Sequence, residues 1–384
     1  MRGEIDEQRN KKLVFASKLV KRFYCDCGAE IFFENQNCGK CARTLGFDSL
    51  SNSIIPIEYC GSEHFKSSDG QVYRLCGNWI DFNTCNWLVP NENPDRLCYS
   101  CRFNRTIPDQ TSSGIGPSKN FFRWYRLEEA KRRLLYTLLG MKFRLISGWD
   151  DAENGLLFDF LEDHERAGGI LNSVTTGYMS GIITINSKEA DDVERVQARS
   201  ALNERQRTIV GHFRHELGHF CWDKIFCQLP LANYFEDVFG ESNLNYKESI
   251  DLYYKKGPPK NWHDGFISAY ASSHPSEDWA ETWNHFLLIY DCLETACEFG
   301  LTSDYFSITD LSGSILMWRE LAVTLNQLNR SIGLNDAYPF IITRRVEEKL
   351  TYVAAVINEY TNTASANESG GHYFKNNKSD IQKA

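Results

Sequence analysis

Q-R-T-I-V-G-H-F-R-H-E-L-G-H-F-C-W-D, residues 206–223, is the stretch that constrains the fold of this sequence most. It contains the motif H-E-x-x-H between His215 and His219. On a helix these two histidines lie one turn apart on one face and can hold one zinc ion, while Glu216 points toward the open coordination position. Apolar residues around the motif indicate that the helix is buried on its other face; they are Ile209, Val210, Phe213, Leu217 and Phe220. The competing interpretation is a charged helix whose histidines only pack or cap.

A further zinc ligand is expected downstream, because a catalytic zinc ion usually has three protein ligands plus water. His212 lies on the same helix face, but three ligands on one straight helix diverge, so we interpret it as a supporting residue or a partner of Glu216. Pro275 opens a second predicted helix in which Glu277 and Glu281 are four residues apart. We expect Glu277 to bind zinc and Glu281 to hold a ligand histidine in place. The reverse assignment and two solvated carboxylates are the alternatives.

These residues predict hydrolysis by a zinc-activated water. Zinc lowers the pKa of a bound water, Glu216 accepts its proton as general base, and the resulting nucleophile attacks a carbonyl carbon polarised by the metal. The tetrahedral oxyanion then needs a hydrogen-bond donor. Tyr270 and His274 are the candidate donors, with His263 behind them.

Thirteen cysteines are the unusual feature of the composition, and most of them precede Asn104. Eight of them form two sets of four, and closely spaced pairs suit zinc because both thiolates of a pair reach one tetrahedral ion from a tight turn. The first set is Cys25, Cys27, Cys38 and Cys41, and the second set is Cys76, Cys85, Cys98 and Cys101. We expect two structural zinc ions in addition to one catalytic ion. Two arrangements stay open: each set holds its own ion, or each ion takes one early and one late pair. Buried cysteines without metal are the alternative.

The predicted fold class is α+β: a small β zinc ribbon with two four-cysteine sites, then a mainly helical domain with a small sheet. A Ser/Gly-rich linker at 109–119 marks the boundary. The predicted organisation is an N-terminal extension at 1–22, the zinc-ribbon region at 23–110, the catalytic domain at 118–362 and a disordered polar tail at 363–384.

Several elements of the second domain are predicted from periodicity. Residues 121–139 have apolar residues at helical spacing, and residues 191–226 are expected to form two helices. Helical character continues at 289–293 and 315–329. The β-branched run after Gly181 predicts a strand at 181–186, whose exposed edge could pair with an extended peptide.

Composition narrows the classes of function. The formal net charge is -9, and phosphate-backbone binding relies on accumulated positive charge, so we expect no nucleic-acid partner. The sequence has no run of about 18 apolar residues and no secretory signal, so we expect no membrane partner and a cytoplasmic location. In such a reducing compartment, many cysteines indicate metal ligation more than disulfides. The expected partner is a peptide or protein substrate, and the ribbon is a candidate contact surface for a protein.

Taken together, these motifs resemble those of bacterial zinc-binding metallopeptidases that have an N-terminal zinc ribbon, a gluzincin-like family of zincins. The matching stretches include C-D-C-G-A-E-I-F-F-E-N-Q-N-C-G-K-C, I-T-I-N-S-K-E-A-D-D, G-H-F-R-H-E-L-G-H-F-C-W-D and S-S-H-P-S-E-D-W-A-E-T-W-N-H, and the resemblance runs from about 23 to about 356. It implies a zincin-like domain with His215, His219 and Glu277 on zinc and Glu216 as catalytic base. The sequence departs from the family at Ser276, where a tryptophan is common.

The leading hypothesis is therefore a zinc-dependent metallopeptidase. A zinc hydrolase of a non-peptide amide would share every residue named above and differ only in the shape of its cleft. The third hypothesis is an inactive zincin-fold adaptor that binds protein through its ribbon, which the loss of a zinc ligand would favour.

Overall fold

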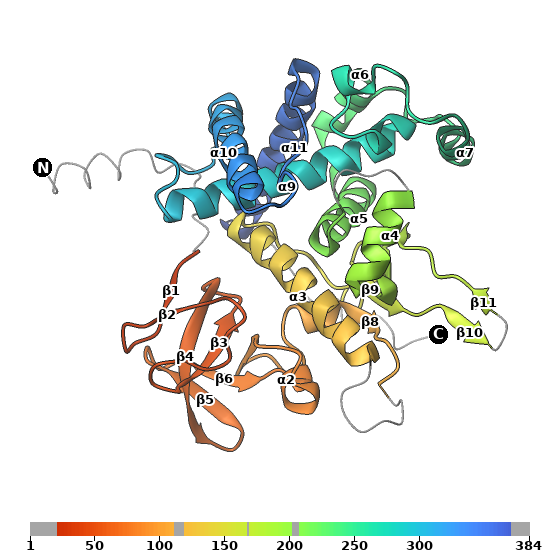
Figure 1. Cartoon of the computed structure of the whole chain (residues 1–384). Coiled ribbons are helices and arrows are strands. Elements are labelled where there is room, and N and C mark those ends of the chain that lie inside the picture. The colour runs from red at the N-terminus through yellow and green to blue at the C-terminus, as the bar shows by residue number, and fades with distance from the viewer. Residues whose placement is uncertain (1–20, 111–118, 167–168, 202–206, 370–384) are drawn as a thin grey trace, which may run out of the picture.

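The computed structural model describes residues 21–110, 119–166, 169–201 and 207–369. A β-rich N-terminal region is followed by a mainly helical region with a small sheet, as Figure 1 shows in red to orange and in yellow to blue. The expected α+β class is confirmed. Within these ranges, no helix has the length and apolar character needed to cross a membrane.

The N-terminal region is built from short antiparallel strands. A two-stranded sheet pairs β1 (Phe23–Tyr24) with β2 (Glu30–Ile31). A five-stranded meander follows, formed by β3 (Thr44–Asp48), β4 (Ser53–Gly61), β5 (His64–Ser67), β6 (Val72–Leu75) and β7 (Leu88–Pro90), with α2 (Gly77–Phe82) between its last two strands and the 3-10 turn η2 (Cys101–Phe103) after it. Gly46 lets β3 approach β7, because a Cβ atom at this position would lie 2.4 Å from the Leu88 side chain.

The two regions share one hydrophobic core. Strand β8 (Asn104–Thr106) lies in the predicted ribbon region, yet it pairs in parallel with β9 (Leu157–Leu161) of the second region. Helix α3 (Lys119–Gly140) lies between the two regions (Figure 1), and its Tyr136 ring packs 4.8 Å from that of Phe33. Arg132 of α3 donates a hydrogen bond to the Thr84 carbonyl at 2.6 Å. The two expected domains therefore pack against each other through α3 and β8, and residues 111–118 of the expected boundary lie outside the described part.

The sheet of the second region has the strand order β12-β13-β9-β8. Strand β13 (Ile182–Asn186) forms where a strand was expected, and it runs parallel to β9. The expectation that this strand offers an exposed edge is wrong. A tight turn with positive φ at Ser180 and Gly181 folds β12 (Gly177–Met179) back onto it, so β12 is the edge strand of this side. A separate hairpin pairs β10 (His164–Arg166) with β11 (Gly169–Asn172).

Helices make up the rest of the second region. They are α4 (Asp192–Ala201), α5 (Ile209–Lys224), α6 (Phe235–Phe239), α7 (Tyr246–Lys256), α8 (Trp262–Gly265), α9 (Pro275–Glu298), α10 (Leu311–Ser331) and α11 (Arg344–Ser369), with short 3-10 turns that include η3 (Ser187–Ala190) and η6 (Tyr270–Ser273). The expected helices at 121–139 and 315–329 and the expected pair within 191–226 are present. Helix α11 continues to Ser369, so the tail expected from 363 is helical at its start; residues 1–20 and 370–384 lie outside the described part.

Helices α5 and α9 pack side by side at the centre of this region (Figure 1). Gly218 makes the close approach possible, since a Cβ atom there would lie 3.0 Å from the Trp283 ring and 3.1 Å from the Ala280 Cα. Its carbonyl accepts a hydrogen bond from Trp279 Nε1 at 2.8 Å. This contact fixes the register in which the side chains of the two helices meet.

Candidate metal centre and cleft

Helix α5 presents His215 and Glu216 of the H-E-x-x-H motif to a cleft. Thr208 starts the helix as its N-cap, and its hydroxyl accepts a hydrogen bond from the Gly211 N–H at 2.9 Å. Phe213, Leu217 and Phe220 are fully buried in the core. The helix therefore turns the opposite face, with His215, Glu216 and His219, away from the core.

Helix α9 brings the carboxylates to the same place. Pro275 occupies the first turn, and His274 is the N-cap whose ring accepts from the Ser276 N–H at 3.1 Å. One turn into the helix, the Glu277 side chain is 1% exposed. Burial of a carboxylate at this level is costly unless it is paired or binds a metal.

The structure brings His215, His219 and Glu277 together as one cluster, with one ligand atom of each within 4.8 Å of the others. His215 Nε2 lies 3.0 Å from Glu277 Oε2, and His219 Nε2 lies 3.4 Å from Glu277 Oε1. The two Nε2 atoms are 3.2 Å apart. The three residues expected to bind the catalytic zinc thus converge on one point.

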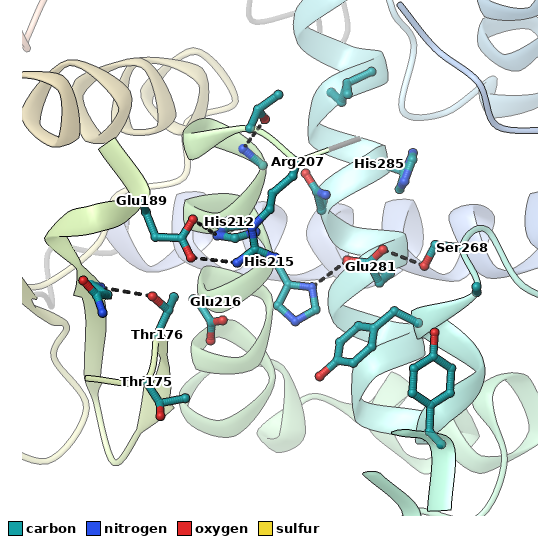
Figure 2. A pocket seen from close by; sticks show the side chains of 18 of the residues that line it. Thr175, Thr176, Glu189, Arg207, His212, His215, Glu216, Ser268, Glu281 and His285 are labelled. Atoms are coloured by element: carbon teal, nitrogen blue, oxygen red, sulfur yellow. Dashed lines mark hydrogen bonds and ion pairs between the residues drawn. The ribbon is translucent and has the colours of Figure 1, made fainter. Parts of the chain in front are cut away.

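Glu281 lies behind this cluster. Its Oε1 is 2.7 Å from His215 Nδ1, and its Oε2 accepts a hydrogen bond from Ser268 Oγ at 2.6 Å (Figure 2). A carboxylate that holds the far nitrogen of a ligand histidine fixes the tautomer and the ring orientation. The geometry fits the expected division of roles, with Glu277 as ligand and Glu281 as the group that orients His215, better than the reverse assignment.

The donor atoms themselves fit a metal ion. Because Glu281 accepts the Nδ1 proton of His215, the Nε2 atom of this ring presents a lone pair to the cluster. Glu277 Oε1 is buried and has no hydrogen-bond partner among the described residues. The two imidazole Nε2 atoms and the Glu277 carboxylate face one another closely enough to share a proton, and a metal cation in the same place would replace that proton. Two nitrogens and one carboxylate oxygen are a common ligand set for zinc, with a fourth position left for water.

The pKa values of His215, Glu277 and Glu281 also show that the cluster favours a positive charge between its side chains. Burial lowers the pKa of His215, but hydrogen bonds to Glu277 and Glu281 outweigh it and hold the pKa well above its usual range. Burial raises the pKa of Glu277, but His219 and His215 outweigh it and hold the pKa well below its usual range. In the same way, His215 overcomes burial and brings the pKa of Glu281 to about 2. The site stabilises a cation between these side chains.

Glu216 and Tyr270 flank the cluster. Both line a cleft of about 720 Å³ that includes His215, and Figure 2 shows Glu216 next to His215. The Tyr270 ring centroid lies 6.0 Å from that of His215. Burial, together with the charge of Glu277, raises the pKa of Tyr270, so the phenol keeps its proton and can donate it in a hydrogen bond. Both residues therefore border the cleft beside His215, and their expected roles stay predictions.

Two other histidines, His274 and His263, do not take the expected places. His274 uses Nδ1 toward Ser276 and Nε2 toward the Leu244 carbonyl at 3.2 Å, so it caps α9 and anchors the segment before α7 and does not donate to an oxyanion. His263 is 61% exposed and lies beside Asp264, outside the cleft. Neither residue lines the cleft.

His212 faces the cleft, but its partner is not Glu216. Its Nδ1 lies 3.3 Å from Glu189 Oε2, and Glu189 also accepts a hydrogen bond from Arg207 at 2.7 Å (Figure 2). Burial raises the pKa of Glu189, but His212 and Arg207 outweigh it and lower the pKa to about 2. Sequence reasoning missed the role of Glu189, although this residue lies in the matching stretch I-T-I-N-S-K-E-A-D-D, because only the turn after β13 brings η3 to α5.

Tyr246 was also missed. It is the first residue of α7, and its ring lies 5.2 Å from that of His274. Burial and the charge of Glu277 raise its pKa. The sequence gives no signal for this contact, because the intervening segment has no periodicity that predicts where α7 packs.

The eight ribbon cysteines separate into the two sets without exchange between them. In the first set, the Sγ atoms of Cys25 and Cys41 and those of Cys27 and Cys38 are each 3.6 Å apart. The second set is buried, with exposed fractions of 0–1%, and the Sγ atom of Cys85 lies 3.6 Å from that of Cys98 and 3.7 Å from that of Cys101. The interleaved arrangement is therefore wrong. Each set of four thiols has the spacing of one tetrahedral zinc site.

Comparison with known proteins agrees with both regions. A family model described as "putative zinc-binding metallo-peptidase" matches residues 120–356, and a zinc-ribbon domain model matches residues 22–112. The chain belongs to this family of zinc-binding metallopeptidases and carries its ribbon at the N-terminal side. Uncharacterized proteins of Mycobacterium tuberculosis and Mycobacterium bovis are each 35% identical to it over 350 residues, which is 88% of this chain and 96% of theirs. No solved structure matches the chain.

Proposed function

We propose that the protein is a zinc-dependent metallopeptidase that hydrolyses peptide bonds. The observation that supports this most is the convergence of His215, His219 and Glu277 on one point beside a cleft that His215 and Glu216 line. Such a set combines three metal ligands with a base on the open side, which is the arrangement that metal-assisted hydrolysis requires.

The residues divide the chemistry among them. A zinc ion in this site supplies a Lewis acid for the substrate carbonyl and lowers the pKa of water. Glu216 removes the proton of the attacking water and returns it to the leaving amine. Tyr270 donates a hydrogen bond to the developing oxyanion. Glu281 keeps the ring of His215 in the orientation that presents Nε2 to the cluster.

An extended backbone that leaves the cleft past Thr175 and Thr176 could reach an edge strand. The edge strand β12 follows Thr175 and Thr176, which line the cleft across from Glu216 in Figure 2. An extended peptide can pair with such an edge through its main chain. This supports a peptide substrate over the alternative of a non-peptide amide. The third alternative, an inactive adaptor, is disfavoured because each of the expected ligands is in place.

The eight ligand thiols of the ribbon have to stay reduced to bind zinc, which supports our proposal that the protein works in a reducing compartment such as the cytoplasm. We further propose that the ribbon, with two structural zinc ions, contacts protein substrates or partners. The ribbon lies beside α3, and its exposed outer strands are the feature that supports this second proposal.

Metal content tests the proposed function directly. Mass spectrometry of the intact full chain should find three zinc ions in the wild type and two in a variant with both His215→Ala and His219→Ala. An unbiased peptide library incubated with the two proteins should be cleaved only by the wild type. An unchanged metal count in the variant, or cleavage that survives the substitutions, would contradict the proposal.

A further inference from the structure

The cleft extends past the metal cluster to a part between α5 and α9. Gly211 lies one turn before His215 on α5, and Asn284 and His285 follow Glu281 by about one turn on α9. Figure 2 shows His285 beyond Glu281. We call this part the deep subsite, and it is lined by Thr208, Gly211, Asn284, His285, Leu288 and Phe340.

The polar group of the deep subsite is the Asn284 amide. Its Oδ1 atom is buried and has no hydrogen-bond partner among the residues that the structure describes. The amide faces the bare backbone of Gly211, since a Cβ atom there would lie 3.8 Å from Asn284 Nδ2 and 3.9 Å from Oδ1. The amide therefore lies across a gap about one methyl group wide from the Gly211 backbone, and both residues line the cleft. A buried polar atom without a partner favours a ligand that supplies one.

In the described part of the chain, no charged side chain lines the deep subsite itself. His285 Nδ1 lies 2.9 Å from the Tyr338 hydroxyl, and burial lowers the pKa of this histidine to about 4 against the opposing charge of Glu281, so the ring is neutral. The neighbouring charged groups already have partners: Glu281 bonds His215 and Ser268, and Arg207 bonds Glu189. A charged side chain in this space would lose its water without gaining a countercharge.

Apolar walls complete the deep subsite. Leu288 and Phe340 line it, and the Phe340 ring lies edge-on to His285 with the ring centroids 4.5 Å apart. Such walls suit the methylene groups of a side chain whose polar end reaches Asn284. Because one helical turn is about 5.4 Å, a side chain next to a bond held at the metal cluster spans this distance.

We propose that the deep subsite selects a substrate residue with a carboxamide side chain, glutamine or asparagine. A carboxamide offers one acceptor and two donors, so it can make two reciprocal hydrogen bonds with the Asn284 amide. It carries no charge, and its methylene groups can contact Leu288 and Phe340. This inference rests on the proposed peptidase function and adds to it the class of residue that is recognised.

Cleavage-site profiling tests the inference. Full-length, zinc-loaded protein is incubated with an unbiased peptide library, and the cleaved sites are read by mass spectrometry. Glutamine or asparagine should be enriched at least about tenfold over leucine and glutamate at one position close to the cleaved bond. Asn284→Leu should abolish this preference in favour of leucine. Thr175→Val, which changes a polar residue elsewhere in the same cleft, is the matched control and should leave the preference unchanged.

A binding measurement separates this inference from the proposed function. The Glu216→Gln variant should bind peptides without cleaving them, so calorimetry can compare two peptides that differ only in glutamine or leucine. The glutamine peptide should bind at least about tenfold more tightly, and Asn284→Leu in the same background should remove the difference. Equal affinities, or a preference that survives Asn284→Leu, overturn the subsite. Cleavage of no peptide at all would overturn the proposed function, and the binding comparison would still decide the subsite.

Discussion

Replacing Glu281 with glutamine removes one negative charge behind the metal cluster and changes little else. The carbonyl of the introduced side chain can still accept from His215 Nδ1, where the carboxylate now lies 2.7 Å away, and its amide group can still meet Ser268. The Glu281 side chain is 16% exposed, so water screens its charge only in part. The loss should therefore appear at the Nε2 atom of His215, which becomes a poorer metal ligand.

The expected size follows from the role of such partners. Removing a group that orients a ligand histidine commonly weakens metal binding by about 10- to 100-fold. This corresponds to about 1.4–2.7 kcal/mol of binding free energy. Glu277→Gln should cost more, because it removes a ligand atom whose carboxylate is 1% exposed and touches both histidines.

Zinc competition against a chelator of known affinity measures both variants, with the two ribbon sites loaded beforehand. Glu189→Gln is the matched control: it makes the same chemical change in the same cleft, at a carboxylate that contacts His212 and Arg207 and no cluster ligand. Its zinc affinity should equal that of the wild type. A larger loss in Glu281→Gln than in Glu277→Gln would show that the two roles are reversed, and no loss would show that Glu281 does not support the site.

Three further predictions concern stability and metal exchange. Gly218→Ala should lower the free energy of unfolding by about 1–3 kcal/mol, because the new Cβ meets the Trp283 ring and the Ala280 backbone; a thermal melt that equals the wild type would refute this packing. Folding lowers the pKa of the Glu189 carboxylate to about 2, so this group contributes stability that is present above its usual pKa of 4.5 and is lost as pH falls toward 2. In urea titrations, the difference in unfolding free energy between the wild type and Glu189→Gln should therefore shrink over this pH range. A difference that grows would contradict this prediction. A chelator should remove zinc from the first cysteine set, which has Cys41 exposed, faster than from the second, whose thiols are buried; equal release rates in an absorbance assay would show that burial does not protect the second site.

The residues that the sequence predicted well are those fixed by local geometry. His215 and His219 share a helix face by periodicity alone, and Pro275 marks the start of the helix that carries Glu277. Cysteine pairs two or three residues apart likewise reach one ion whatever the surrounding fold. In each case a few neighbouring positions determine the outcome, so no long-range information is needed.

The errors concern contacts between distant segments. The pairing of His212 with Glu189 depends on how η3 meets α5, and the engagement of His274 depends on the Leu244 carbonyl before α7. The edge position of β12 follows from a turn at Ser180 that reverses the chain beside β13. The spacing of residues along the chain does not predict which of these distant segments come into contact.

The shared core around α3 has a consequence for how the protein matures during synthesis. The second cysteine set is already buried to 0–1% exposure, and Arg132 of α3 reaches the Thr84 carbonyl beside it. During translation the ribbon leaves the ribosome before α3 does, so zinc has to enter the second site before that helix docks and closes it. Helices α5 and α9, which carry the candidate metal centre, are made later still and fold against this surface. In a nascent chain whose second cysteine site has not bound zinc, α5 and α9 would therefore fold against a ribbon that is itself incompletely folded.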